Sequence, residues 1–185
     1  MLFSTPKYFA LTILLFSVSL CAQDGVYSID KESSVIEFKI GHLGLLKVKG
    51  TFESYEGTVG FDQSELKEIS CKFLVESIAT GNEERDDILE TEPYFDVQNY
   101  PDITYVLVDT KTIDGETILN GKLKIKDSEQ DISFPASINF DESIDSVIIE
   151  AETRIDRRDY DLIFDSMNGL IGNKIDIKLS ISSTK

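Results

Sequence analysis

Apolar and polar residues alternate through most of this chain once its first two dozen residues are past. Between Ile132 and Phe140 every second residue is apolar, and the residues between them are Ser, Pro, Ser and Asn. A repeat of two residues is typical of a β-strand that buries one face. The same repeat occurs in the segments 36–40, 46–52, 69–75, 119–125, 147–155 and 175–181. The pattern therefore predicts a chain built almost entirely of β-strands.

The apolar faces of these segments carry no charged residue. About eight antiparallel strands with one dry face fit a single extended, closed, lipocalin-like β-barrel. A sandwich of two sheets would show the same alternation and stays open as the alternative. Asp114–Gly115 predicts a type I′ hairpin turn, whereas Ile103–Thr110 has apolar residues on both faces and is ambiguous. Without repeats or a shift in composition, residues 23–185 are expected to form one all-β domain.

One short helix is predicted within this β-rich chain. Thr80 and Glu83 have the spacing of a capping box, in which the hydroxyl accepts a free backbone N–H and the glutamate reaches back. We expect the helix near residues 83–90, and Pro93 ends it because proline cannot continue a helix. Two aromatic residues, Tyr94 and Phe95, follow. The helix lies between two strands, so we expect it to cover an end or a flank of the barrel.

The segment Ser77–Tyr105, SIATGNEERDDILETEPYFDVQNYPDITY, resembles the YceI-like family of secreted bacterial lipid-binding proteins. Further blocks match in the family's order: Ile40–Phe52 with His42, Gly44, Gly50 and Phe52, then Gly57, Phe61–Asp62, Gly121-x-Leu123-x-Ile125 and Ile155–Asp156–Arg157. The resemblance covers nearly all of the chain after its first two dozen residues. It implies a barrel that binds polyisoprenoid or fatty-amide-like molecules and that the Ser77–Tyr105 segment crosses at one end.

The first residues have the pattern of an export signal. Lys7 is followed by an apolar run from Tyr8 to Leu20, which is too short to span a membrane because a spanning helix needs about 20 apolar residues. Cleavage after Ala22 would leave a periplasmic or secreted protein. The alternative is a lipid anchor at Cys21, but such a cysteine normally follows a small residue, and Leu20 is not small. We therefore expect residues 1–22 to be a cleaved signal peptide.

Charge excludes one class of partner. The chain carries 18 Lys and Arg against 34 Asp and Glu, a net charge of −16 that would become −17 without Lys7. Nucleic acid requires a basic surface, and docking onto anionic lipid by charge alone is equally disfavoured. No second apolar stretch is long enough to span a membrane. The oligomeric state stays open, with a homodimer among the options.

Groups that could carry chemistry are scarce, so we predict no enzyme, no catalytic residue and no metal site. There is a single histidine, His42, and no hydrolase, zinc or phosphate-loop motif. Cys71 is expected to be a buried small hydrophobic residue. The acidic residues Asp156, Asp159, Asp161 and Asp165 lack the spacing of a calcium loop, and a solvated loop compensated by arginines is favoured. No cofactor is expected beyond a bound isoprenoid-type lipid.

The predicted partner is a long hydrophobic molecule inside the barrel, of the polyisoprenoid, isoprenoid quinone or fatty-acid amide class that the resemblance implies. A structural or partner-binding β-domain with a filled core would use the same residues and is the alternative. His42 is either a polar contact at the barrel mouth or a strand residue that bonds backbone. The predicted ligand-contacting residues are Ile36, Phe38, Ile40, His42, Val48, Phe52, Phe61, Cys71, Phe73, Val75, Leu89, Phe95, Phe134, Ile138, Phe140, Val147, Ile149, Ile175, Ile177 and Leu179.

The helix is predicted to act as an apolar lid. Ile88 and Leu89 would face the barrel, together with the aromatic residues that follow the helix. Arg85 and Asp86 would fasten this lid by hydrogen bonds or ion pairs, with Arg157 as one of the partners open to Asp86. The residues predicted for the lid and its fastening are Arg85, Asp86, Tyr94 and Arg157.

Overall fold

The computed structural model describes residues 24–44, 46–141, 143–164 and 169–185. The predicted signal peptide, residues 1–22 with the alternative anchor at Cys21, lies outside the described residues, as does Asp165. Within the described ranges, no helix is both long and apolar enough to cross a membrane.

Strands make up almost all of the regular structure. In chain order the elements are β1 (Gly25–Ile29), β2 (Val35–His42), β3 (Leu46–Phe52), β4 (Tyr55–Asp62), β5 (Glu65–Leu74), the 3₁₀ turn η1 (Val75–Ser77), β6 (Ile78–Ala79), α1 (Glu83–Leu89), β7 (Asp102–Ile113), β8 (Glu116–Ile125), β9 (Ser128–Asp141), β10 (Ser146–Asp156), the 3₁₀ turn η2 (Arg157–Tyr160) and β11 (Ile171–Thr184).

The last strand closes the sheet on itself. Neighbouring strands pair antiparallel in the order β1-β4-β5-β7-β8-β9-β10-β11, and β11 pairs back onto β1 at Ser28–Thr184 and Ile29–Ser183. The rest of β11 pairs with β2, which pairs with β3, and β3 pairs with β6. β2 and β3 thus extend β1 and β4, and β6 extends β5. The prediction of a closed eight-stranded antiparallel barrel with one short helix is confirmed.

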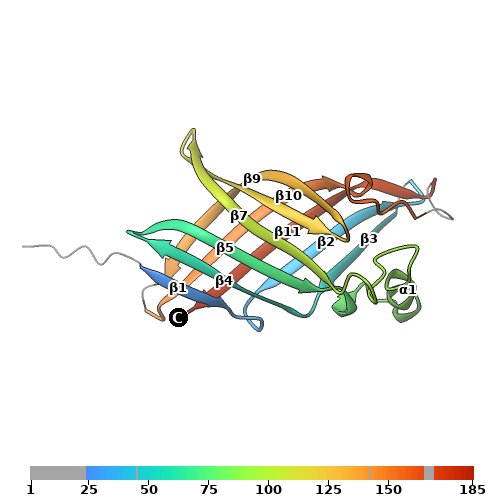
Figure 1. Ribbon diagram of the computed structural model, residues 1–185, viewed down its shortest axis with the longest axis horizontal. Helices are drawn as coiled ribbons and strands as arrows, with labels where there is room; N and C mark the ends of the chain where they lie inside the picture. Colours follow the sequence, from blue (N-terminus) through green and yellow to red (C-terminus); the bar gives the residue numbers. More distant parts are fainter. Residues whose placement is uncertain (1–23, 45, 142, 165–168) are drawn as a thin grey trace, which may run out of the picture.

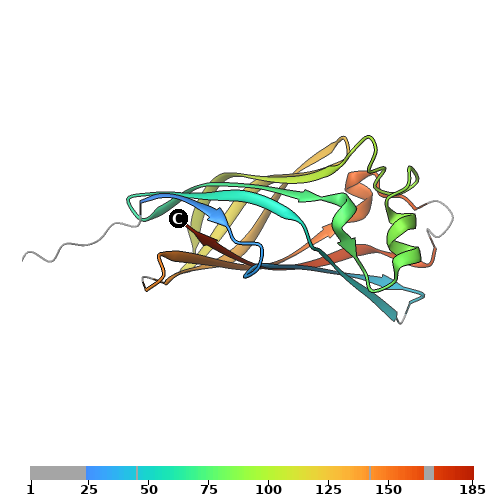
Figure 2. The same ribbon diagram turned by 90° about the horizontal axis from the view of Figure 1, so that it is seen from below.

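The barrel is elongated and its two ends differ (Figures 1 and 2). At one end lie α1, η2 and the tip of the β2–β3 hairpin, which we call the helix end. At the other lie the start of β1, the C-terminus and the β7–β8 turn, which we call the terminal end. Asp114 and Gly115 in that turn have φ of 52° and 85°. Two positive φ angles are the signature of the predicted type I′ turn.

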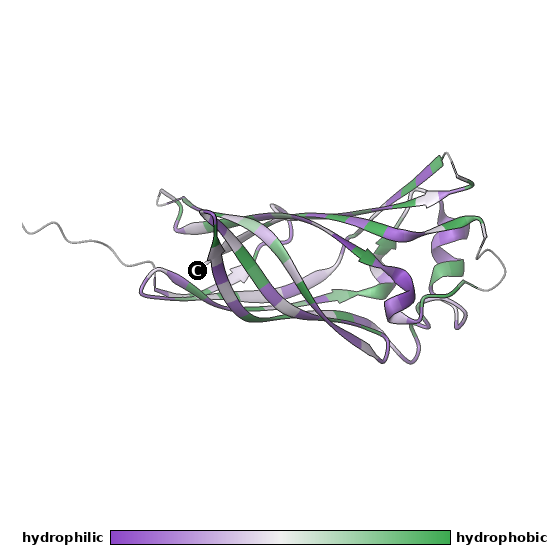
Figure 3. Ribbon diagram, turned by 90° about the horizontal axis from the view of Figure 1, so that it is seen from above, coloured by the Kyte–Doolittle hydropathy of each residue, from purple (hydrophilic) through white to green (hydrophobic). Residues whose placement is uncertain are grey.

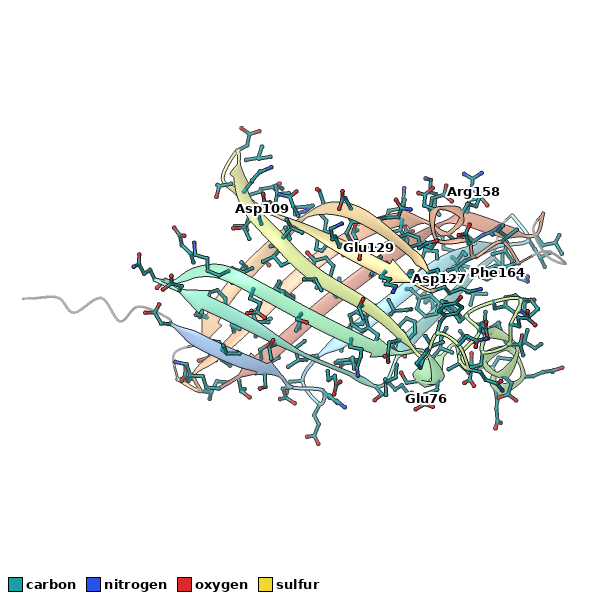
Figure 4. All side chains as sticks on the ribbon, in the orientation of Figure 1. Glu76, Asp109, Asp127, Glu129, Arg158 and Phe164 are labelled. Atoms are coloured by element: carbon teal, nitrogen blue, oxygen red, sulfur yellow. The ribbon has the colours of Figure 1, made fainter. Side chains whose placement is uncertain are left out.

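Successive residues of each strand face the inside and the outside of the barrel in turn. Hydrophilic and hydrophobic residues follow one another along the strands in Figure 3, and Asp109 and Glu129 lie on the outer surface in Figure 4. The ambiguous segment follows the same rule. Ile103, Tyr105 and Leu107 of β7 are buried, whereas Val106 and Val108 are exposed.

Gly57 marks a point where two strands approach closely. A Cβ at this position would lie 2.3 Å from the carbonyl oxygen of Ser70 and 2.9 Å from Cδ1 of Ile29. The first of these contacts is with the backbone of the paired strand β5, which cannot move without breaking the register of the sheet. The absence of a side chain at Gly57 is therefore a packing requirement of the wall.

We expect Gly57→Ala to lower the free energy of unfolding by roughly 1–3 kcal/mol, because an inserted methyl group overpacks the wall. Gly169→Ala is the matched control, since a Cβ at Gly169 meets no atom of the described residues within 4 Å. Urea denaturation of the two variants and the wild type measures the difference. Equal midpoints for all three would contradict the close approach.

Candidate functional site

An apolar cavity of about 430 Å³ occupies the barrel interior from the helix end to beyond its middle. Its deep wall includes Val59, Leu119 and Ile149, and its outer rim includes Asn82 and Glu84 beside α1. Both rim residues are exposed, whereas the three deep residues are buried. The cavity therefore opens beside α1 and is bounded by apolar side chains in its depth.

Most residues predicted to contact a ligand lie on this wall, although contact itself stays a prediction. They come from β2, β3, β5, α1, the segment after it, β9, β10 and β11. The members on the wall are Ile36, Phe38, Ile40, His42, Val48, Phe52, Cys71, Phe73, Leu89, Phe95, Phe134, Ile149, Ile175, Ile177 and Leu179.

Five predicted contact residues lie away from the wall: Phe61, Val75, Ile138, Phe140 and Val147. The Phe61 and Phe140 rings pack together with centroids 4.8 Å apart, and the Tyr27 ring lies 5.8 Å from that of Phe61. This aromatic cluster belongs to the core on the terminal-end side of the cavity. For Phe61, Ile138, Phe140 and Val147, strand parity selects the inward face but carries no information on depth, whereas Val75 lies in η1.

Several wall residues were not predicted as contacts. Ile103 and Tyr105 come from the strand with apolar residues on both faces, and Leu162 and Phe164 come from the loop after η2. Figure 4 shows Phe164 toward the helix end. Its ring centroid lies 5.0 Å from that of Tyr94. The loop residues follow no strand period, so alternation could not identify them.

The residue that caps the helix lies one position before Glu83. The side-chain oxygen of Asn82 accepts the backbone N–H of Arg85 at 2.8 Å. Asn82 is therefore the N-cap, and the predicted Thr80–Glu83 capping box is wrong. The predicted helix near residues 83–90 is observed as Glu83–Leu89.

Thr80 has a different role, as the anchor of the helix. Arg85 donates from Nε to the Thr80 hydroxyl at 2.7 Å and from Nη2 to the Thr80 carbonyl at 2.8 Å. The Thr80 backbone N–H donates to the Asp86 carboxylate at 3.0 Å, and the Thr80 hydroxyl also donates to it. Thr80 directly follows β6, which pairs with β3. This Thr80 clamp ties the first turn of α1 to the barrel wall.

Behind the clamp, α1 presents apolar side chains to the cavity. Ile88 and Leu89 of the helix, with Tyr94 and Phe95 after it, all lie on the cavity wall. Tyr94 and Phe95 are buried, whereas Ile88 is 41% exposed at the rim. The helix thus adds apolar side chains to the wall beside the opening, where its bonds to Thr80 hold it.

The predicted pairing of Arg157 with Asp86 is wrong. Arg157 is fully buried and donates to the carbonyl oxygens of Gly172 at 3.0 Å, Leu162 at 2.5 Å and Ile163 at 2.9 Å. Its guanidinium carbon also lies 5.0 Å from the centroid of the Phe164 ring. The arginine thus holds the loop after η2 against the start of β11.

The carboxylate that precedes Arg157 in the sequence, that of Asp156, is paired with two other cations. Asp156 accepts from the Arg158 guanidinium at 2.6 Å and lies 3.1 Å from the Lys174 ammonium. The hydrogen bond from Arg158 holds the pKa of Asp156 well below its usual range. The negative charge of Asp156 is therefore balanced by Arg158 and Lys174.

Cys71 and His42 occupy different parts of the wall. Cys71 is buried, and burial raises the pKa of its thiol to about 12, so the thiol stays protonated and is a poor nucleophile. This agrees with the predicted buried hydrophobic role. His42 ends β2, where it pairs with Ile171 and Leu46 near the opening.

Comparisons of the sequence with known proteins agree on one family. A family model described as the YceI-like domain matches residues 27–183. A UPF0312 protein of Pseudomonas savastanoi pv. phaseolicola is 32% identical over 133 residues, which are 69% of this chain and 68% of that protein. Protein YceI of Salmonella arizonae is 28% identical over 134 residues, 70% of each chain.

Solved structures share the fold. The crystal structure of Burkholderia cenocepacia BcnA superposes with a TM-score of 0.76 at 18% identity, covering 84% of this chain and 99% of that one. A polyisoprenoid binding domain from Saccharophagus degradans gives a TM-score of 0.72 at 15% identity, covering 85% and 97%. At these identities the structures establish the barrel fold alone.

We expect Arg157→Met to lower the free energy of unfolding by on the order of 3 kcal/mol, because buried carbonyl oxygens would lose their donors. Arg154→Met is the control, since Arg154 is exposed and makes a surface ion pair with Asp176, a kind of pair that contributes at most about 1 kcal/mol. Thermal and urea unfolding measure both. A similar, small loss in the two variants would show that the buried guanidinium does not hold the loop.

Proposed function

The chain belongs to the YceI-like domain family, and on this premise we propose that it is an exported carrier or storage protein for a long hydrophobic ligand. The ligand is held in the barrel cavity and is of the polyisoprenoid, isoprenoid quinone or fatty-acid amide class. Residues 1–22 act as a cleaved signal peptide, so the protein works in the periplasm or outside the cell.

One observation carries this proposal: the apolar cavity of about 430 Å³ that opens beside α1. A volume of this size is typical of a ligand pocket, roughly 300–1,000 Å³. Each methylene group that leaves water for such a wall contributes about 0.8 kcal/mol. An extended isoprenoid or acyl chain would therefore bind through apolar contact alone. The Saccharophagus degradans relative, described as a polyisoprenoid binding domain, supports the same class of ligand.

The proposed role is binding and not catalysis. The nucleophile on the cavity wall is Cys71, and its raised pKa keeps it as a thiol. Near the opening, the polar wall residues Thr80 and Arg85 are engaged in the Thr80 clamp, and His42, Asn82 and Glu84 also line the cavity there. A β-domain with a filled core is the alternative, and the first experiment below separates it from a carrier.

We expect an organic extract of the protein, purified from its native compartment, to contain a long-chain lipid by mass spectrometry. Phe134→Asp should lose this lipid, because an unpaired carboxylate on the apolar wall is costly. Ser137→Asp is the control on the outer face of the same strand, where the side chain is exposed. Circular dichroism reports whether each variant folds. Wild-type protein without lipid would support the filled-core alternative.

We expect Arg85→Ala to release a fluorescent prenyl analogue about tenfold faster, because the cover loses two hydrogen bonds to Thr80. The strands keep their pairing, so the barrel should stay folded. Glu83→Ala is the control, since Glu83 is exposed on the first turn of the same helix. Equal dissociation rates at equal thermal stability would mean that α1 is a passive plug and not a cover that opens.

A further inference from the structure

The cavity ends at a similar depth on several strands. Val59 of β4, Tyr105 of β7 and Ile149 of β10 line its deep part. On each of these strands, the next inward residue toward the terminal end is buried but lies away from the cavity wall. These residues are Phe61, Leu107 and Val147. The cavity therefore ends against a layer of packed side chains inside the barrel.

Two phenylalanine rings from opposite walls meet in this layer. β4 and β9 are four strands apart in either direction around the ring β1-β4-β5-β7-β8-β9-β10-β11. The Phe61 ring of β4 and the Phe140 ring of β9 nevertheless have centroids 4.8 Å apart and planes inclined at 65°, an edge-to-face contact. The Tyr27 ring of β1 packs edge-on against Phe61 at 5.8 Å. The aromatic cluster of Tyr27, Phe61 and Phe140 thus closes the lumen from wall to wall.

The polar side chains of the cavity lie at its other end. Thr80, Asn82, Glu84 and Arg85 line the cavity beside α1, whereas its depth is apolar. A polar head group buried in the apolar depth without a partner would be costly. A lipid with one polar end therefore lies with its head group at the opening and its tail toward the aromatic cluster.

The cavity is long enough for an extended chain. β11 lines it from Ile171 to Ile181. This length of strand spans about 33 Å at roughly 3.3 Å per residue, and a strand tilt of about 40° leaves about 25 Å along the barrel axis. A volume of about 430 Å³ distributed over such a length is that of a narrow channel. The position at which the channel is blocked therefore decides how much of a chain it holds.

We propose that the aromatic cluster sets the longest lipid chain that the cavity accommodates, with the end of the chain in contact with Phe61 and Phe140. This inference rests on the proposed carrier function and adds chain-length specificity to it. Affinity rises with each isoprene unit that leaves water for the apolar wall. Once the tail reaches the aromatic cluster, any further unit stays outside the opening and adds no affinity.

The test measures prenols that lengthen by one isoprene unit at a time, from geraniol to solanesol, by displacement of a fluorescent prenyl analogue. In the wild type, affinity should rise up to a limiting chain length and then stay level. Affinity that rises as far as solanesol would overturn the inference, because the cluster would then not block the channel.

Phe61→Ala should move this limit to a longer prenol. The space left by a deleted core ring can hold an apolar group, and a phenyl ring is similar in size to an isoprene unit. The first prenol beyond the wild-type limit should bind the variant about tenfold more tightly than the wild type. Phe140→Ala removes the ring that meets Phe61 from the opposite wall. Phe140 is half-buried, so this second variant is the milder change, and thermal unfolding reports whether each variant folds.

Phe52→Ala is the matched control. Phe52 lines the cavity and packs beside Phe38 and Phe73, with ring centroids 5.7 Å and 6.3 Å away. Its removal widens the channel from the side, so affinities should change while the limiting chain length stays that of the wild type. An unchanged limit in Phe61→Ala and Phe140→Ala, or an equal shift in Phe52→Ala, would overturn the role of the aromatic cluster and leave the carrier function standing. If the wild type bound neither a prenol nor the prenyl analogue, both proposals would fail together.

Discussion

The pairing of the last strand with the first is the interaction on which the rest of the structure depends. β11 pairs with β1 near the C-terminus and with β2 along most of its length, so one strand closes both parts of the wall. Closure removes the edges of the ring formed by β1, β4, β5 and β7 to β11, which would otherwise be free to pair with other chains. It also directs the apolar face of every strand toward one enclosed space. The cavity and its cover exist because this ring is complete.

Strand parity predicted the barrel but not how its interior is divided. The run Ile132–Phe140 places both Phe134 and Phe140 inside, and the structure agrees. Phe134 lines the cavity, whereas Phe140 packs with Phe61 in the aromatic cluster toward the terminal end. Depth depends on which side chains from opposite walls meet, and those contacts join residues about 80 positions apart. Alternation along one strand cannot encode them.

Polar contacts near the opening were the hardest to predict. The helix itself was predictable, yet Asn82 caps it, and Thr80 instead accepts from Arg85 and donates to Asp86. Arg157 was expected to pair with a carboxylate, but it bonds to main-chain carbonyl oxygens of the loop after η2 and of β11. Every residue carries such a carbonyl, so the pattern of side chains does not predict these partners. The position of the Tyr105 hydroxyl was equally hard to predict, because it depends on the absence of a side chain at Gly121.

The two ends of the described chain lie together, opposite the opening. Gly25 begins β1 and Lys185 follows β11, while the cavity opens beside α1 at the far end of the barrel (Figure 1). A tether, a fusion partner or a sensor surface joined near either residue would leave the opening facing away from the attachment. A group attached at the terminal end would therefore leave the opening beside α1 unobstructed.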